Sequence, residues 1–208
     1  ETVDLVVADP PYFKVVGEKW DYQWRTEEEY IAWSITWFQE AARVLRLGGS
    51  MYLFGYFRIL SLLLPHLEKE GIRLRQQIVV DKGIQAVSGR ATRKYKMFPN
   101  VTESILFLYK DPKPFVRQLL RRRQQERGLT AKEINERLGV KSNGGGMWSI
   151  YTGDNVCEQL PTPEYWDKLQ AILEFTYPYE RLAITFNPQM GYTDVWNDIN
   201  FYREKDRI

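Results

Sequence analysis

Cysteine and histidine are almost absent from this chain, which has one of each among its 208 residues, Cys157 and His66. A single cysteine excludes an intramolecular disulfide framework and suits a reducing cytoplasm. We expect Cys157 to lie in the core. Because His66 has no neighbouring Cys or His in the sequence, we expect neither a metal site nor a histidine-based nucleophile.

Long apolar runs and a strong net charge are missing as well. No apolar stretch reaches the roughly 18 residues of a transmembrane helix, and no signal peptide is visible, so we expect a cytoplasmic protein without a membrane partner. The net charge of +2 means that any affinity for nucleic acid comes from local patches. The hydrophobic content of 44% predicts one domain with a substantial core and a smaller lobe.

The apolar residues alternate between strand and helix patterns. Residues 3–8 form a short β-branched run before two prolines, which predicts a buried strand. Residues 27–45 carry a wide apolar stripe behind Thr26 and three glutamates, which predicts a helix capped by Thr26. Further strands are predicted at 50–56, 74–80, 104–109 and 182–186, and a further helix at 57–70. This alternation predicts an α/β fold whose strands are mostly parallel.

The pattern changes after Lys110, where Pro112 and Pro114 indicate a boundary. Helices are predicted at 115–127, 130–138 and 162–175, without strands between them. We therefore expect a core of residues 1–111 and 176–208, with residues 112–175 as a small helical insertion.

An acid, two prolines and an aromatic ring follow the first predicted strand as Asp9, Pro10, Pro11 and Tyr12. The carboxylate and a proline carbonyl can accept hydrogen bonds from an exocyclic NH₂ group, and neither proline has an N–H of its own. The ring can stack on the flat group that carries the amine. Open α/β sheets bind ligands at this edge, so the segment predicts a site for methylating a nucleobase amine. The plainer alternative is a proline turn with an incidental acid.

With the segments that follow, this motif resembles the DNA amino-methyltransferases that use S-adenosylmethionine, and its order along the chain resembles their beta group. The matching segments are Asp9–Tyr12, residues 37–52, residues 80–82, residues 102–110 with Glu103 near the start, and residues 194–196. The resemblance implies a Rossmann-like methyltransferase sheet, double-stranded DNA as substrate and a role in restriction-modification in a bacterium or phage. It also implies that the helical insertion is the target-recognition region, and it leaves a homodimer open.

The same resemblance implies a mechanism. Asp9 and the Pro10 carbonyl would hold the amine of a base flipped out of the duplex, and Tyr12 would stack on that base, with Phe13 as a second wall or as ordinary packing. Aspartate at the first motif position favours adenine N6 over cytosine N4. The family's Phe-x-Gly-x-Gly segment, which holds the cofactor, is not in this sequence. We therefore expect a piece cut at both ends, in which Asp9 is the cofactor contact and S-adenosylmethionine binds poorly. The alternatives are a DNA-binding but catalytically silent subunit and a cytosine-N4 methyltransferase.

Two basic segments are candidates for contact with DNA phosphates, or else are solvated surfaces. The first, between predicted strands, contains Arg90, Arg93, Lys94 and Lys96. The second is the helix at 115–127, from which we select Arg121, Arg122 and Arg123.

The segment after the second basic stretch has a helix signature. Thr130 and Glu133 form a capping box, and Gly139 suits the left-handed position past the helix end. This resembles the first half of a helix-turn-helix, although glycines 144–146 interrupt a second helix, and a capped helix packed in the lobe is the alternative. If this region reads DNA, the groove-facing candidates are Lys141, Ser142, Asn143 and Trp148.

Overall fold

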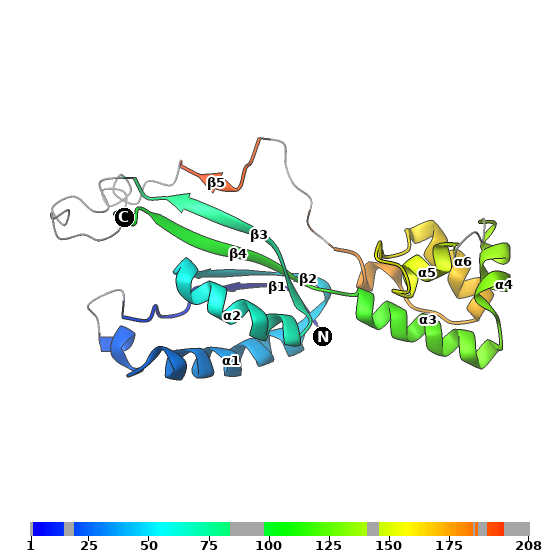
Figure 1. The fold of residues 1–208 in the computed structure, drawn as a ribbon, viewed down its shortest axis with the longest axis horizontal. Helices are drawn as coiled ribbons and strands as arrows, with labels where there is room; N and C mark the ends of the chain where they lie inside the picture. Colours follow the sequence, from blue (N-terminus) through cyan, green and yellow to red (C-terminus); the bar gives the residue numbers. More distant parts are fainter. Residues whose placement is uncertain are drawn as a thin grey trace. The chain divides into compact units, whose positions relative to one another are not determined.

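A five-stranded sheet organises the first part of the chain in the computed structural model, which describes residues 2–14, 19–83, 98–140, 146–184, 186 and 191–197. The strands lie in the order β1 (Val3–Ala8), β2 (Leu45–Gly55), β4 (Thr102–Lys110), β3 (Ile72–Asp81) and β5 (Val195–Trp196), as Figure 1 shows. The predicted α/β class is confirmed.

Strand direction differs from the expected, mostly parallel sheet in one respect. β1 pairs with β2 and β3 with β5 in parallel, but β4 is antiparallel to both of its neighbours. The reason is that β3 and β4 follow each other as a hairpin, and β4 inserts between β2 and β3. The amino end of β4 therefore lies at the same edge as the carboxyl ends of β1 and β2.

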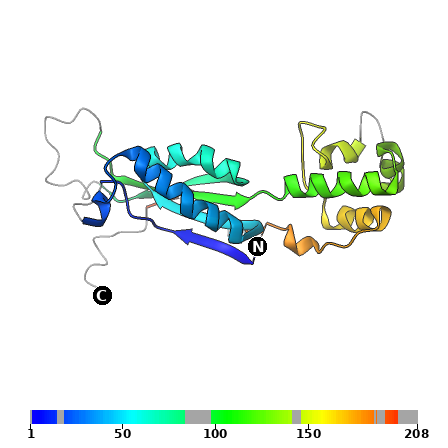
Figure 2. The same cartoon turned by 90° about the horizontal axis from the view of Figure 1, so that it is seen from below.

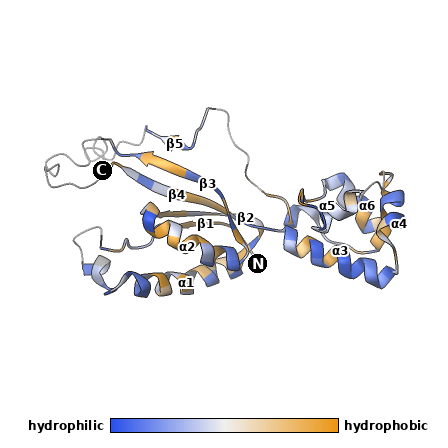
Figure 3. Cartoon of the chain, viewed as in Figure 1, coloured by the Kyte–Doolittle hydropathy of each residue, from blue (hydrophilic) through white to orange (hydrophobic). Residues whose placement is uncertain are grey.

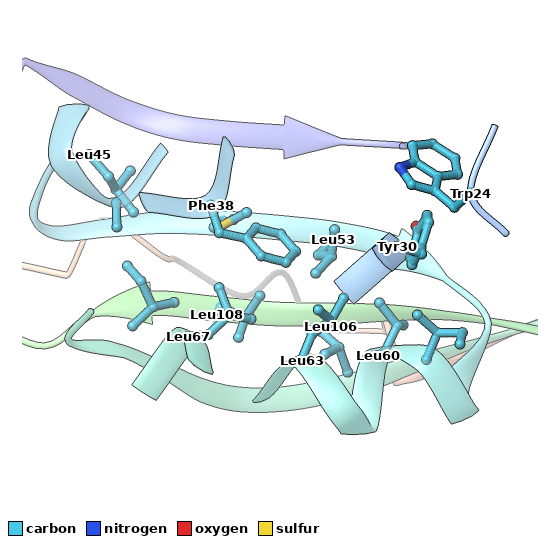
Figure 4. Close-up of a cluster of buried hydrophobic side chains, with 14 residues drawn as sticks. Trp24, Tyr30, Phe38, Leu45, Leu53, Leu60, Leu63, Leu67, Leu106 and Leu108 are labelled. Atoms are coloured by element: carbon cyan, nitrogen blue, oxygen red, sulfur yellow. The ribbon is translucent and has the colours of Figure 1, made fainter. Parts of the chain in front are cut away.

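Helices α1 (Glu27–Val44) and α2 (Phe57–Lys69) supply side chains to the main core, and Figure 2 shows both running alongside the strands. Thr26 caps α1 as predicted, with its side chain accepting a hydrogen bond from the Glu29 N–H at 3.2 Å. Alternate residues of β2 and β4 face these helices, as a strand's period of two requires. Residues of this core shown in Figure 4 include Phe38, Leu53, Leu60, Leu63, Leu67, Leu106 and Leu108.

The other alternate residues of β2 and β4 form a smaller cluster. The Tyr52 and Phe107 rings stack with their centroids 4.8 Å apart, and Phe186 lies 4.7 Å from Phe107. On β1, however, Leu5 and Val7 are 52% and 62% exposed. The expectation of a buried strand is therefore wrong for this segment, because β1 is the edge strand of the described sheet and only Val6 and Ala8 pack against the core.

The start of β2 also differs from the prediction, which placed it at residue 50. The strand begins at Leu45, directly after α1, and runs through both glycines. Gly48 has a φ of 72°, and a Cβ at Gly49 would lie 2.9 Å from the Arg46 carbonyl oxygen and 3.1 Å from that of Asp4. The two glycines therefore allow the irregular pairing of β1 with β2.

The chain divides into two compact units, which we call the sheet unit (residues 1–110 and 184–208) and the helical unit (residues 111–183). The sequence placed the second boundary at 175/176 instead. Residues 182–184 are not in a strand, contrary to expectation, and the fully buried Leu182 follows the short helix η4 (Tyr179–Arg181) within the helical unit.

The described residues of the helical unit form four α-helices: α3 (Lys113–Arg127), α4 (Ala131–Leu138), α5 (Gly146–Tyr151) and α6 (Pro163–Leu173). The capping box of Thr130 with Glu133 is present, and Gly139 has a φ of 74°, so both local predictions are confirmed. Figure 3 shows α3 as mostly hydrophilic with an apolar stripe. Its inward residues Val116 and Leu120 are buried, together with Ile134, Trp148, Trp166, Leu169 and Leu173.

Cys157 is exposed, so its predicted core position is wrong. The cysteine follows α5 in a stretch that has no regular helix or strand. Such a segment has no helix or strand periodicity that would place a small apolar side chain in the core.

Candidate active site at the ends of β1 and β4

Asp9, Pro10, Pro11 and Tyr12 follow β1 directly, at the edge where the parallel strands end. Asp9 is exposed, while both prolines and Tyr12 are half-buried. The turn is held from α1, because the Tyr30 hydroxyl donates a hydrogen bond to the Pro11 carbonyl oxygen at 2.9 Å. A short apolar strand and two rigid prolines thus fix the position of one acid and one ring.

These four residues line an open pocket of about 380 Å³ together with Trp20 and Glu103. The structure thereby brings together all four residues that the sequence selected as catalytic. Trp20 lies in the short helix η1 (Lys19–Tyr22) and is 45% exposed, which is unusual for an indole. Sequence reasoning assigned no role to Trp20 or Glu103. In the sequence, the large ring of Trp20 among polar neighbours could have indicated an exposed functional residue. No sequence feature indicated the contact between Glu103 and Tyr12.

Tyr12 and Glu103 interact across 91 residues of sequence. The Tyr12 hydroxyl donates a hydrogen bond to Glu103 Oε1, and Lys82 Nζ lies 2.9 Å from Glu103 Oε2. Burial raises the pKa of the Tyr12 phenol well above its usual value, and the Glu103 hydrogen bond and the negative charges of Glu103 and Asp9 raise it further. Tyr12 therefore remains a neutral donor across the physiological pH range.

Phe13 has a different environment from the one that its sequence position suggested. It is half-buried, packs against the main core with its ring centroid 5.7 Å from that of Tyr30, and is not among the residues that line the 380 Å³ pocket. This favours the alternative of ordinary packing for Phe13. Trp20 takes the place at the pocket that the sequence gave to Phe13.

The predicted phosphate-contacting residues Arg90, Arg93, Lys94 and Lys96 lie outside the described residues, as do Lys141, Ser142 and Asn143. The described residues that flank the first segment are informative, because Lys82 contacts Glu103 and its N–H donates to the Val101 carbonyl at 2.8 Å. Lys82 and Val101, which flank this segment in the sequence, thus lie near Glu103 of the pocket. The segment's contact with DNA stays a prediction.

The arginines of α3 differ in their surroundings. Arg121 forms an ion pair with Asp154, and Arg123 donates to the Leu173 carbonyl at 3.0 Å and also to that of Glu174. Arg122 is 68% exposed at its side chain and lies 3.8 Å from Glu126. Contacts within the unit therefore account for Arg121 and Arg123, and a phosphate contact fits Arg122 best among the three.

Trp148, selected as a groove-facing candidate, is buried in the helical unit, and its backbone N–H donates to Asn135 Oδ1 at 3.0 Å. The prediction for this residue is wrong, because α5 turns its tryptophan into the unit's core. The sequence could not show this, since an indole suits both base stacking and packing.

The helical unit has an open hollow of its own, with a volume of about 460 Å³. Phe115, Phe175 and Tyr177 line it together with Arg122 and Arg123. The exposed acid Glu174 also lines it but is paired with Arg127, and no proline is among its described lining residues, whereas the exposed Asp9 lies beside two prolines in the sheet unit's pocket. Amine chemistry therefore fits the sheet unit.

The described part of the chain contains no helix that is both long and apolar enough to cross a membrane. Within those same ranges, no three Asp, Glu, His or Cys side chains come together in a way that could hold a metal ion.

Comparison with known proteins gives a consistent set of matches. The family model described as DNA methylase, of the N6/N4 methyltransferase type, matches residues 3–206. The type II methyltransferase M.HpaI of Haemophilus parainfluenzae is 26% identical over 180 residues, which are 83% of this chain and 52% of that protein. The chain thus spans about half the length of this curated relative.

Solved structures that resemble the chain include two complexes with the methyl donor. The M1.HpyAVI–SAM complex is 19% identical with a TM-score of 0.38 and covers 53% of this chain and 45% of its own. TTHA0409 of Thermus thermophilus, complexed with S-adenosyl-L-methionine, is 14% identical with a TM-score of 0.38 and covers 96% and 92%.

Proposed function

Because the chain belongs to the DNA methylase family, we propose that the intact protein transfers a methyl group from S-adenosylmethionine to an exocyclic amine of a DNA base. Within this proposal, adenine N6 is the favoured acceptor and cytosine N4 the alternative. Aspartate at the first motif position supports adenine through the family resemblance. Membership of the family also supports S-adenosylmethionine as the donor.

One observation carries the proposal: an exposed carboxylate, two prolines and two aromatic rings line one open pocket at the ends of parallel strands. The amine of adenine is a weak nucleophile, because its lone pair is delocalised into the ring. Asp9 and the Pro10 carbonyl accept its two N–H groups, which draws the nitrogen toward a tetrahedral shape and makes the lone pair available. One proton leaves the nitrogen after the N–C bond forms.

S-adenosylmethionine, when bound, supplies an electrophilic methyl group, whose bond to sulfur breaks as the bond to nitrogen forms. Of the described residues, Asp9 is the one that we place beside this group. An exposed carboxylate at the mouth of the pocket fits that place, since it can face the amine and the cationic donor together.

The base must leave the duplex to reach this pocket, which costs a few kcal/mol. Stacking on one aromatic side chain returns about 1–3 kcal/mol. Tyr12 alone is therefore a weak compensation, whereas Tyr12 and Trp20 together match the cost. This is the reason to assign both rings, not Tyr12 and Phe13, as the walls of the base site.

The test uses the intact protein, unmethylated plasmid DNA and methyl-labelled S-adenosylmethionine. We expect Asp9→Asn to lower the rate about 100-fold or more, because an amide cannot replace the acceptor pair of a carboxylate. Asp4→Asn is the matched control, since Asp4 lies on the same strand with its side chain 72% exposed and paired with Arg46. Label that persists in the Asp9 variant would refute this site.

Digestion of the labelled DNA to nucleosides decides the acceptor. N6-methyldeoxyadenosine is the expected product. If N4-methyldeoxycytidine is found instead, the acceptor is cytosine, and the assignment of the Asp9 site still holds. DNA binding without any label from the wild-type protein would instead support the silent DNA-binding subunit. Double-stranded DNA as partner, a cytoplasmic location and a homodimer remain predictions from the sequence.

A further inference from the structure

We propose that Glu103 is a positioning residue, which holds the Tyr12 ring in place as a wall of the base pocket and is itself held by Lys82. This inference rests on the proposed function, and it adds a residue to which neither the motif nor the family match assigns a role. The pocket is lined by two carboxylates, Asp9 and Glu103. The proposed function assigns Asp9 to the substrate amine and leaves Glu103 without a role.

The geometry comes from the antiparallel direction of β4. Glu103 is the second residue of that strand, opposite Val80 of β3, so its side chain reaches the edge where β1 delivers Tyr12. Each carboxylate oxygen has its own partner, because Oε1 accepts the Tyr12 hydroxyl and Oε2 faces Lys82 Nζ at 2.9 Å.

The two carboxylates of the pocket therefore suit different tasks. Asp9 is exposed, whereas the Glu103 side chain is only 14% exposed and carries a neutralising cation. Accepting a substrate amine would require Glu103 to give up the tyrosine or the lysine inside a largely buried site, which is costly for a carboxylate. Glu103 is thus fitted to orient Tyr12 and not to contact the base.

Orientation of the ring matters because a free tyrosine side chain has several rotamers and only some present a flat face to the pocket. A hydrogen bond formed on folding removes that freedom before the base arrives, which lowers the entropy lost on binding.

A double-mutant cycle tests this in the intact protein, with Tyr12→Phe, Glu103→Gln and the combination of both. Each single variant should lower kcat on plasmid DNA about tenfold, because each breaks the same charge-assisted hydrogen bond. The double variant should be no slower than the slower single variant. Affinity for S-adenosylmethionine should stay unchanged. Glu68→Gln is the control, since Glu68 is 51% exposed in a 3.6 Å pair with Arg73.

Three outcomes would overturn the inference. If the two single effects multiply, Glu103 acts on the substrate directly. If Glu103→Gln leaves kcat and KM for DNA unchanged, it has no positioning role. If the wild-type protein does not methylate DNA, the proposed function fails together with this role. If the wild-type protein is active but the two single effects multiply, only the positioning role fails.

A second readout does not depend on turnover. In protein labelled with ¹³Cζ-tyrosine, the Tyr12 resonance is assigned by its loss in Tyr12→Phe. At neutral pH its chemical shift should change in Glu103→Gln, because a neutral amide accepts the Tyr12 hydroxyl more weakly than a carboxylate does, and an unchanged shift would contradict the contact. Because Glu103→Gln removes the ion pair between Glu103 and Lys82, the variant Glu103→Gln with Lys82→Met serves if the single variant fails to fold. This neutral pair should fold and retain the loss in kcat.

Discussion

At the end of β1, the sheet unit presents Asp9 and Trp20 to an open pocket, while α3 of the helical unit directs Arg121 and Arg123 onto acids and carbonyls of its own unit. In sequence, the arginines were the more conspicuous feature, with three consecutive cations on one helix. In the structure, two of them are occupied by local contacts. Charge density in a sequence is therefore a weaker indication of a binding surface than one acid placed after a strand.

The largest expected difference within the sheet unit is between Trp20 and Phe13. Trp20→Ala should lower kcat/KM for DNA about tenfold or more with little change in stability, because the proposed stacking of this exposed ring on the base is lost. Phe13→Ala should instead lower the free energy of unfolding by about 2 kcal/mol, because its ring packs in the core. Methylation kinetics and urea unfolding measure the two effects. A reversed pattern would restore Phe13 as the second wall.

Substitutions of two neighbouring arginines of α3 should differ moderately in their effect on the free energy of unfolding. Arg123 donates to the carbonyls of Leu173 and Glu174 at the end of α6, where helix carbonyls lack partners. Arg123→Ala should therefore lower the free energy of unfolding by about 1–3 kcal/mol. Arg122→Ala should change it by less than about 0.5 kcal/mol. Urea unfolding followed by circular dichroism measures both.

DNA binding by the Arg122→Ala variant tests whether α3 contacts DNA. If Arg122 contacts a phosphate, Arg122→Ala lowers the slope of log affinity against log salt by about one. An unchanged slope would remove α3 from the DNA interface and leave its arginines as structural residues.

The smallest effects concern one phenol in each unit. Tyr12 donates to Glu103, whereas the buried Tyr151 hydroxyl has no hydrogen-bond partner among the residues that the structure describes. At pH 7, Tyr12→Phe should cost about 1 kcal/mol of stability, while Tyr151→Phe should be neutral or stabilising by up to about 1 kcal/mol. Thermal unfolding of both variants tests this, and equal losses would contradict it.

The pH dependence of Tyr151 has a definite sign. Burial, with smaller contributions from Tyr165 and Tyr179, raises the pKa of Tyr151 to about 12. The unfolded chain loses this proton near pH 10, so between about pH 10 and 12 the folded state holds more protons and stability falls as pH rises. Tyr151→Phe should therefore lose less stability than the wild type over this range.

Much of the site follows from short stretches of sequence. Thr26, Thr130 and Gly139 begin or end helices as predicted, because caps depend on atoms within a turn of the helix. Asp9 to Tyr12 follow the end of β1 as predicted for a similar reason, since prolines end a strand through their own missing N–H groups. Trp148 and Cys157 show the limit, because burial depends on what packs against a residue.

The sequence alone therefore determined the α/β class and the family, and it predicted the helical insertion and the strand end that carries the acid. Only the tertiary structure decided that β4 runs antiparallel and brings Glu103 to Tyr12, that Trp20 faces the pocket, and that Arg121 and Arg123 are paired within their unit. Local preferences act over a few residues along the chain. Strand order and register join residues 91 positions apart, and no short-range pattern specifies that meeting.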